Sequence, residues 1–290
     1  MPVVAVSQRR AVTVAARTRA HTTPRSPLRS RTTACASVAL QPASVISAAC
    51  AHARRALLGA IDEKHRRIIV HLPIEANGNL CAPTVPLADI VFAGGMRQRF
   101  AEATQPIVAD GLLEGVSDVS YHGVLESQAD GMGVWSRRDD FTLVTHVGDQ
   151  TFDVFLKLLR GEFGERVMRQ DHAIVLVNPY FTKGDNVGQP WDVKLREAAR
   201  EELDDAPWIT AYAHLPFRTA GSSRLGTLYK PSHDRGWRLH AATESGWNAA
   251  SFGEVSDESM WDEDPCAGWH TERMPDWSVV KQELVDALVL

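Results

Sequence analysis

The stretch that decides the fold is "IVLVNPYFTKGDNVGQPWD", residues 174–192. Its first five residues predict a buried strand, because a short apolar run bounded by turn residues is typical of a strand inside a sheet. Pro179 ends this strand, and a loop with two glycines leads to a helix that begins near Trp191. In an open α/β sheet, ligands bind in the loops that follow the carboxyl ends of strands. This loop is therefore the first place to look for a functional site.

The candidate binding loop has two interpretations. The position of Asn178 directly before Pro179 favours a structural role, in which its side-chain amide hydrogen-bonds to backbone groups of the loop. Asp185 and Asp192 flank the loop either as a carboxylate pair or, more simply, as a turn residue and a first-turn acid favoured by the helix dipole. We expect the loop to be mainly a structural corner on the rim of a partner-binding surface. The candidate residues are Asn178, Pro179, Gly184, Asp185, Gly188, Gln189 and Trp191.

The pattern on both sides of this stretch alternates between helical and strand periodicity. Helices are predicted over 45–67, 94–115, 148–164, 190–205 and 276–290, strands over 68–74, 118–124 and 141–147, a loop over 128–140, and four short β-runs between 208 and 255. Pro106 either kinks the second helix or begins a new one. This order predicts the α/β class, because alternating strands and helices form parallel crossovers. We expect a layered, Rossmann-like mixed sheet with a parallel core, a C-terminal antiparallel β-meander and a final helix, all in one domain over 45–290.

Charge separates the first part of the chain from the rest. Residues 1–60 contain nine arginines, no lysine and no acid. Removing these nine from the 31 basic residues leaves 22 basic against 36 acidic residues from residue 61 onward, a net charge of −14. The Arg-, Ser- and Ala-rich segment 1–40 lacks a secretory apolar run and has the composition of an organelle transit peptide, for a chloroplast or a mitochondrion. The acidic remainder disfavours nucleic acid, and no apolar stretch is long enough to predict a transmembrane segment.

Motifs of known chemistry are missing from the sequence. The candidate loop does not match a P-loop, no G-x-G-x-x-G follows a strand, and no G-x-S-x-G elbow occurs. Cys266 and His270 lack a second pair at metal-ligand spacing, and no C-x-x-C is present. We therefore predict no cofactor, no metal site and no catalytic residue. His146, Asp149 and Thr151 form a secondary candidate site, in which a helix N-terminus would receive phosphate, although a structural role is the simpler interpretation.

Several segments resemble a plastid family of a domain of unknown function. "ARRALLGAIDEKHRRIIVHLPI" resembles its opening helix and strand, "GGMRQRF" its second helix, and "AIVLVNPYF" with "GQPWD" its central strand and loop. "AYAHLPFRTAGSSRLGTLYKPSHDRGWRLH" resembles its closing segment. The resemblance covers about residues 51–255 and is weakest after residue 255. The family includes a factor for photosystem II accumulation and a domain fused to a plastid adenylate kinase.

The resemblance implies a place and a role, but no reaction. It implies a chloroplast location, in the stroma or peripheral to the thylakoid, and protein partners such as photosystem II subunits or assembly factors. We accordingly expect a non-enzymatic auxiliary protein that aids assembly or accumulation of a photosynthetic complex. The alternative is a nucleotide- or phosphate-binding plastid enzyme, which the α/β class permits but does not establish. Most of the tryptophans are expected in the core, and an exposed one would mark a partner surface.

Overall fold

The computed structural model describes most of the chain between residues 41 and 248. The described residues are 41–76, 79–81, 104–125, 131–138, 140–149, 151–163, 172–179, 187, 191–203, 206–218, 225–243 and 246–248. The leader predicted for 1–40 and the final helix predicted for 276–290 lie outside these residues. So do Gly184, Asp185, Gly188 and Gln189 of the candidate loop.

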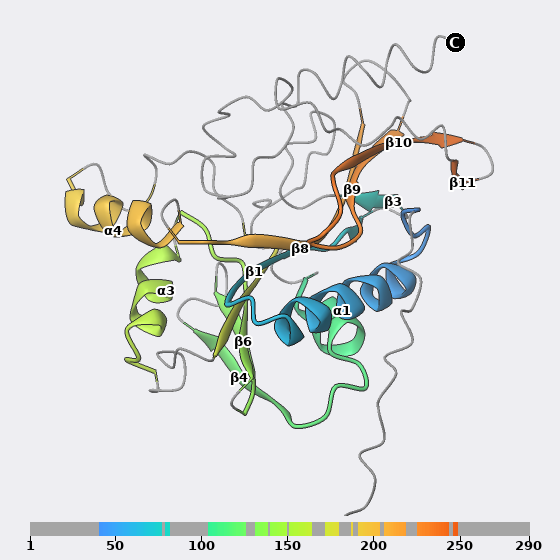
Figure 1. Ribbon diagram of the computed structural model, residues 1–290. Helices are drawn as coiled ribbons and strands as arrows, with labels where there is room; N and C mark the ends of the chain where they lie inside the picture. The colour runs from blue at the N-terminus through green and yellow to red at the C-terminus, as the bar shows by residue number, and fades with distance from the viewer. Residues whose placement is uncertain are drawn as a thin grey trace, which may run out of the picture. The chain divides into compact units, whose positions relative to one another are not determined.

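The described elements alternate between helix and strand before they end in strands alone (Figure 1). In chain order they are α1 (Ile46–Asp62), β1 (Arg67–His71), β2 (Ile74–Ala76), β3 (Asn79–Cys81), the π-helix η1 (Ile107–Leu112), β4 (Val119–Leu125), β5 (Met132–Arg137), β6 (Phe141–Thr145), α3 (Phe152–Leu159), β7 (Ala173–Val177), α4 (Val193–Leu203), β8 (Ile209–Arg218), β9 (Leu225–Lys230), β10 (Arg238–Thr243) and β11 (Gly246–Asn248). None of these helices has the length and apolar character needed to cross a membrane.

Nine of the described strands form one mixed sheet, in the order β11-β10-β9-β8-β1-β7-β6-β5-β4. The four central strands β8, β1, β7 and β6 run parallel, and antiparallel strands extend the sheet on both sides. The mixed α/β class, the parallel core and the C-terminal meander are thereby confirmed. The Rossmann-like layering stays a prediction. Because β8 pairs with both β1 and β9, the meander continues the parallel core without a break.

The predicted loop over 128–140 is wrong, because Met132–Arg137 forms strand β5. Gly133 lies inside this strand for a packing reason. A Cβ on Gly133 would lie 2.7 Å from the ring of Trp135 and 3.0 Å from Thr145 Oγ1. Glycine in a strand often marks such a close approach. The backbone N–H of Gly133 donates to Thr145 Oγ1 at 3.0 Å, which joins β5 to the end of β6.

Two buried hydrophobic clusters are formed by alternate residues of the same central strands. Ile68 and Val70 of β1 pack in one cluster with residues of α1 and η1. Ile69 packs in the other with residues of α3 and α4. Because successive strand residues point to opposite faces, the two clusters lie on opposite faces of the sheet. This explains why β7 is apolar throughout: a parallel strand covered on both faces has no solvated side.

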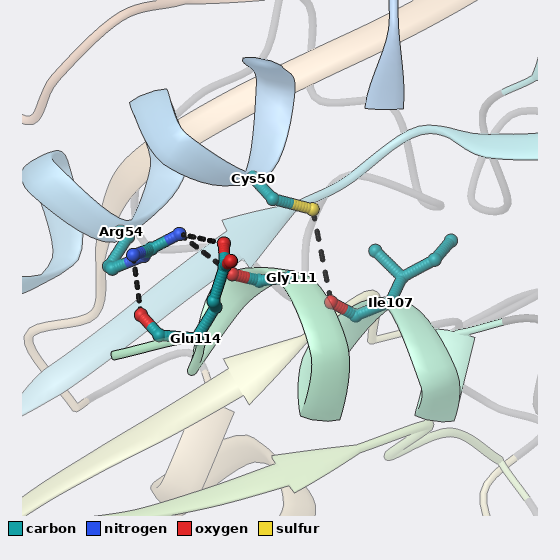
Figure 2. Close-up of polar contacts among 5 residues, drawn as sticks. All are labelled: Cys50, Arg54, Ile107, Gly111 and Glu114. Carbon is teal, nitrogen blue, oxygen red and sulfur yellow. Dashed lines mark hydrogen bonds and ion pairs between the residues drawn. The ribbon is translucent and has the colours of Figure 1, made fainter. Parts of the chain in front are cut away.

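Helix α1 and the π-helix η1 are joined by polar contacts (Figure 2). The Arg54 guanidinium donates from Nη2 to the Gly111 carbonyl at 3.0 Å and from Nη1 to the Glu114 carbonyl, and it pairs with the Glu114 carboxylate at 3.2 Å. The thiol of Cys50 approaches the Ile107 carbonyl at 3.8 Å. Burial raises the pKa of Cys50 to about 11, so this cysteine is a packed thiol and a poor nucleophile.

Gly111 is the contact point of these two helices, and we predict that Gly111→Ala destabilises the fold by about 1–3 kcal/mol through overpacking. A Cβ there would lie 2.7 Å from Cys50 Sγ and 3.1 Å from Cys50 Cβ. Urea unfolding of the single and double variants measures the effect. Cys50→Ala should recover much of the loss in the double variant, because it removes the colliding sulfur. If the losses in unfolding free energy of Gly111→Ala and Cys50→Ala simply add in the double variant, a collision between these two residues is not the cause.

Candidate functional site

Asn178 occupies the corner directly after β7 and is fully buried. Its Oδ1 accepts a hydrogen bond of 2.7 Å from the backbone N–H of Leu72, the residue after β1. Its Nδ2 donates to Thr104 Oγ1 at 3.3 Å, and its own N–H donates to the Val70 carbonyl at 3.0 Å. The side chain therefore ties the ends of β7 and β1 to the segment that leads into η1. This is the structural role that its sequence position favoured.

His146 stands at the equivalent place on the neighbouring strand. It follows β6, and its backbone N–H donates to the Val177 carbonyl at 3.2 Å. Both His146 and Asn178 adopt the left-handed backbone region, with φ of 57° and 50°. Few residues other than glycine tolerate this region, and asparagine is among the most tolerant. The adjacent parallel strands β6 and β7 are thus each followed by a residue in the left-handed region. Because the two strands are neighbours, the residues that begin the secondary and primary candidate sites, His146 and Asn178, lie side by side.

The turn before α3 is closed by its own hydrogen bonds. The Thr151 hydroxyl accepts from the Gly148 N–H at 3.0 Å and lies 2.9 Å from the His146 carbonyl, to which it donates. Thr151 holds the N-cap position of α3, but its side chain makes no capping hydrogen bond to that helix. Asp149 is buried in the same turn, where its carboxylate would repel a phosphate. The described part of the secondary site therefore has poor chemistry for an anion.

Trp191 is far more exposed than Asn178 and Pro179, the other candidate-loop residues that the structure describes. It is 75% exposed, and Val193 at the start of α4 is 55% exposed. Pro179, in contrast, is buried with Asn178. Contiguous exposed apolar patches mark interaction surfaces, and Trp191 and Val193 are only two residues apart in the chain. The candidate loop thus begins in a buried corner and ends at an exposed apolar rim, here defined as Trp191 and Val193.

Sequence reasoning missed a buried aromatic–histidine face on the antiparallel side of the sheet. Cross-strand pairing places His214 of β8 opposite Tyr229 of β9, and Thr227 of β9 opposite His240 of β10. The Tyr229 ring lies 6.0 Å from His214, 5.8 Å from His240 and 5.8 Å from Tyr212. The signal was present in "AYAHLP", because Tyr212 and His214 are two residues apart and so share one face of a strand.

Burial controls the ionisation of this face. Desolvation, together with the nearby His240 and His52, lowers the pKa of His214 to about 3. Desolvation and the Arg238 charge lower the pKa of His240 to about 4. Burial raises the pKa of Tyr229 to about 12. At neutral pH the two imidazoles and the phenol are therefore uncharged, and their tight ring packing suits a polar part of the core rather than a ligand pocket.

Comparison with family models, with curated proteins and with solved structures finds no match for this chain.

Proposed function

We propose that this protein is a non-enzymatic auxiliary protein of the chloroplast stroma, and that it binds a protein partner through the rim formed by Trp191 and Val193. The complex it serves would be a photosynthetic one, such as photosystem II, during assembly or accumulation. The observation that carries the proposal is the 75% exposure of Trp191, with Val193, two residues further along the chain, 55% exposed. Tryptophan is among the residues that contribute most to binding energy at protein interfaces.

The corner at Asn178 does not itself offer a group for binding a ligand. Both amide atoms of Asn178 already have partners within the fold, so this side chain is poorly placed to recognise a ligand. We therefore assign partner binding to the rim and a structural role to Asn178. The proposed layered, Rossmann-like arrangement would hold this corner at the carboxyl edge of the parallel strands.

Two further features support the location and the kind of partner. The acid-free, arginine-rich leader and the resemblance to the plastid family both favour the chloroplast, with the mitochondrion as the alternative. The net charge of −14 after residue 60 favours partners with basic loops, because complementary charge steers association. Peripheral contact with the thylakoid would follow from such a partner.

We predict that Trp191→Ala removes most partner binding while the fold stays intact. Truncating a central aromatic anchor typically costs about 2–4 kcal/mol of binding, a loss of about 30-fold or more in affinity. The measurement is affinity purification of the mature protein from chloroplasts, with quantitative mass spectrometry of photosystem subunits and assembly factors. Phe163→Ala is the matched control, because Phe163 is also exposed, at 50%, but lies beyond the end of α3.

The same experiment separates this proposal from the alternative. Equal recovery of partners with Trp191→Ala and Phe163→Ala would contradict partner binding through the rim. A purification without photosynthetic partners, combined with thermal stabilisation by ATP, ADP or NADPH, would favour the nucleotide- or phosphate-binding enzyme instead. Such a ligand would have to bind elsewhere than the turn at Asp149, whose carboxylate disfavours phosphate.

A further inference from the structure

Three metal-ligating side chains from distant parts of the sequence meet near the amino end of β1. Glu63 and His65 lie between α1 and β1, and His233 lies in the turn between β9 and β10. One ligand atom from each lies within 4.8 Å of the other two. Glu63 Oε2 is 2.8 Å from His233 Nε2, and the rings of His65 and His233 are 4.8 Å apart. This trio is independent of the rim at Trp191.

The end of α1 fixes two of these side chains. Lys64 adopts the left-handed region, with φ of 71°, and reverses the chain as a residue after a helix end commonly does. The N–H of Glu63 donates to the Gly59 carbonyl and the N–H of His65 donates to the Ala60 carbonyl, both at 3.0 Å. The backbone at Glu63 and His65 is therefore set by hydrogen bonds that do not involve His233.

The third side chain comes from a turn that is also braced internally. The Arg235 N–H donates to the Ser232 carbonyl at 3.2 Å, and the Lys230 ammonium donates to the Arg235 carbonyl at 2.7 Å. These contacts fix the turn around His233 without using its ring. Two independently built turns thus present the three ligands to one point, which is the preorganisation a metal site needs.

We propose that Glu63, His65 and His233 form a zinc site with an open coordination position. Two imidazoles and one carboxylate, with water as the fourth ligand, are an established ligand set for zinc. Magnesium and calcium prefer oxygen ligands alone, which a site with two histidines does not offer. An ordinary ion pair would explain the contact between Glu63 and His233, but it would not explain why the His65 ring lies next to the His233 ring.

Small side-chain movements suffice to close the site around an ion. Ligand atoms about 2.1 Å from a tetrahedral zinc lie about 3.4 Å from one another. The Glu63–His233 pair is already closer than this, and no two of the three ligand atoms are more than 4.8 Å apart. The Glu63 side chain is 62% exposed, so it is free to rotate, whereas the His233 side chain is 14% exposed and held. The exposed side of the site leaves room for water.

The test is zinc titration of the tag-free, full-length protein by isothermal calorimetry in the presence of a non-thiol reductant. We expect one zinc ion per chain, with affinity reduced at least tenfold by His65→Ala, His233→Ala or Glu63→Gln, since even loss of an outer-shell partner of a ligand costs about 10–100-fold. The control is His122→Ala. His122 is a histidine on β4 that contacts Ser136 and lies outside the trio. Zinc binding unchanged in all three variants, or none in the wild type, would overturn the proposal.

A second readout guards against variants that fail to fold. Circular dichroism in the presence of a chelator establishes whether each variant keeps the wild-type fold. Zinc should raise Tm in the wild type and in His122→Ala, because a ligand that binds only the folded state stabilises it. At the same zinc concentration it should raise Tm less in the three site variants. Cobalt in place of zinc should give visible absorption bands in the wild type, and the same bands in His233→Ala would contradict the assignment.

Discussion

Lowering the pH from 7 to 5 is expected to reduce the free energy of unfolding by about 4 kcal/mol through His214 and His240 alone. In the folded protein the pKa values of these groups are about 3 and about 4, because burial disfavours the imidazolium. In the unfolded chain both return to about 6.5. Below that pH the unfolded state binds protons that the folded state does not, and each histidine contributes about 2 kcal/mol of the loss at pH 5.

The sign of this effect follows from the direction of the pKa shifts. Because both folded pKa values are depressed, the stability linked to these histidines is fully present above about pH 6.5. It is lost as the pH falls toward the folded pKa values of about 4 and about 3. Further acidification below these values would cost nothing more through these two groups. The steepest loss is therefore expected between about pH 6 and pH 4.

Urea unfolding at pH 7, 6 and 5 measures this loss. The matched variants are His214→Gln and His240→Gln, whose amides stay neutral throughout the range. Each should be less stable than the wild type at pH 7 because of repacking, but its stability should fall by about 2 kcal/mol less between pH 7 and pH 5. Carboxylates elsewhere titrate equally in both proteins and so cancel in the comparison. A double variant with the wild-type pH dependence would show that these histidines are accessible to protons in the folded state.

The central parallel strands were the most predictable part of the fold. The strand around Val175 is covered on both faces, so its sequence is apolar without interruption and is hard to mistake. Strand β5 was not predictable in the same way. Its glycines resembled those of a turn, and only the position of the Trp135 ring in three dimensions shows why Gly133 belongs inside a strand.

The candidate site was predictable where it depends on neighbours in the chain. Asn178 could be assigned a corner because it stands between an apolar strand and a proline. The trio of Glu63, His65 and His233 could not be assigned, because nothing in the sequence indicates that the turn after β9 approaches the end of α1. The sequence predicted no metal site because metal-binding motifs place their ligands close together in the chain, whereas 170 residues separate Glu63 from His233.

Asn178→Ala is expected to destabilise the folded protein by about 3 kcal/mol. The substitution leaves the buried N–H of Leu72 without its acceptor, which costs about 1–3 kcal/mol. It also places alanine in the left-handed region that Asn178 occupies at φ 50°, which costs roughly 1 kcal/mol more. Urea unfolding at pH 7 measures the change, and near-UV circular dichroism reports whether the variant keeps native packing.

Asn178→Gly separates the two contributions, because glycine loses the same hydrogen bonds but adopts a positive φ without strain. It should destabilise by about 1 kcal/mol less than alanine does. Equal losses in the two variants would mean that φ contributes little and the bond to Leu72 accounts for the effect. If instead Asn178→Ala leaves stability unchanged but abolishes recovery of the partner, the corner itself is the binding site. Intact stability is incompatible with a buried structural amide, so this single residue decides whether the corner after β7 is structural or contacts the partner directly.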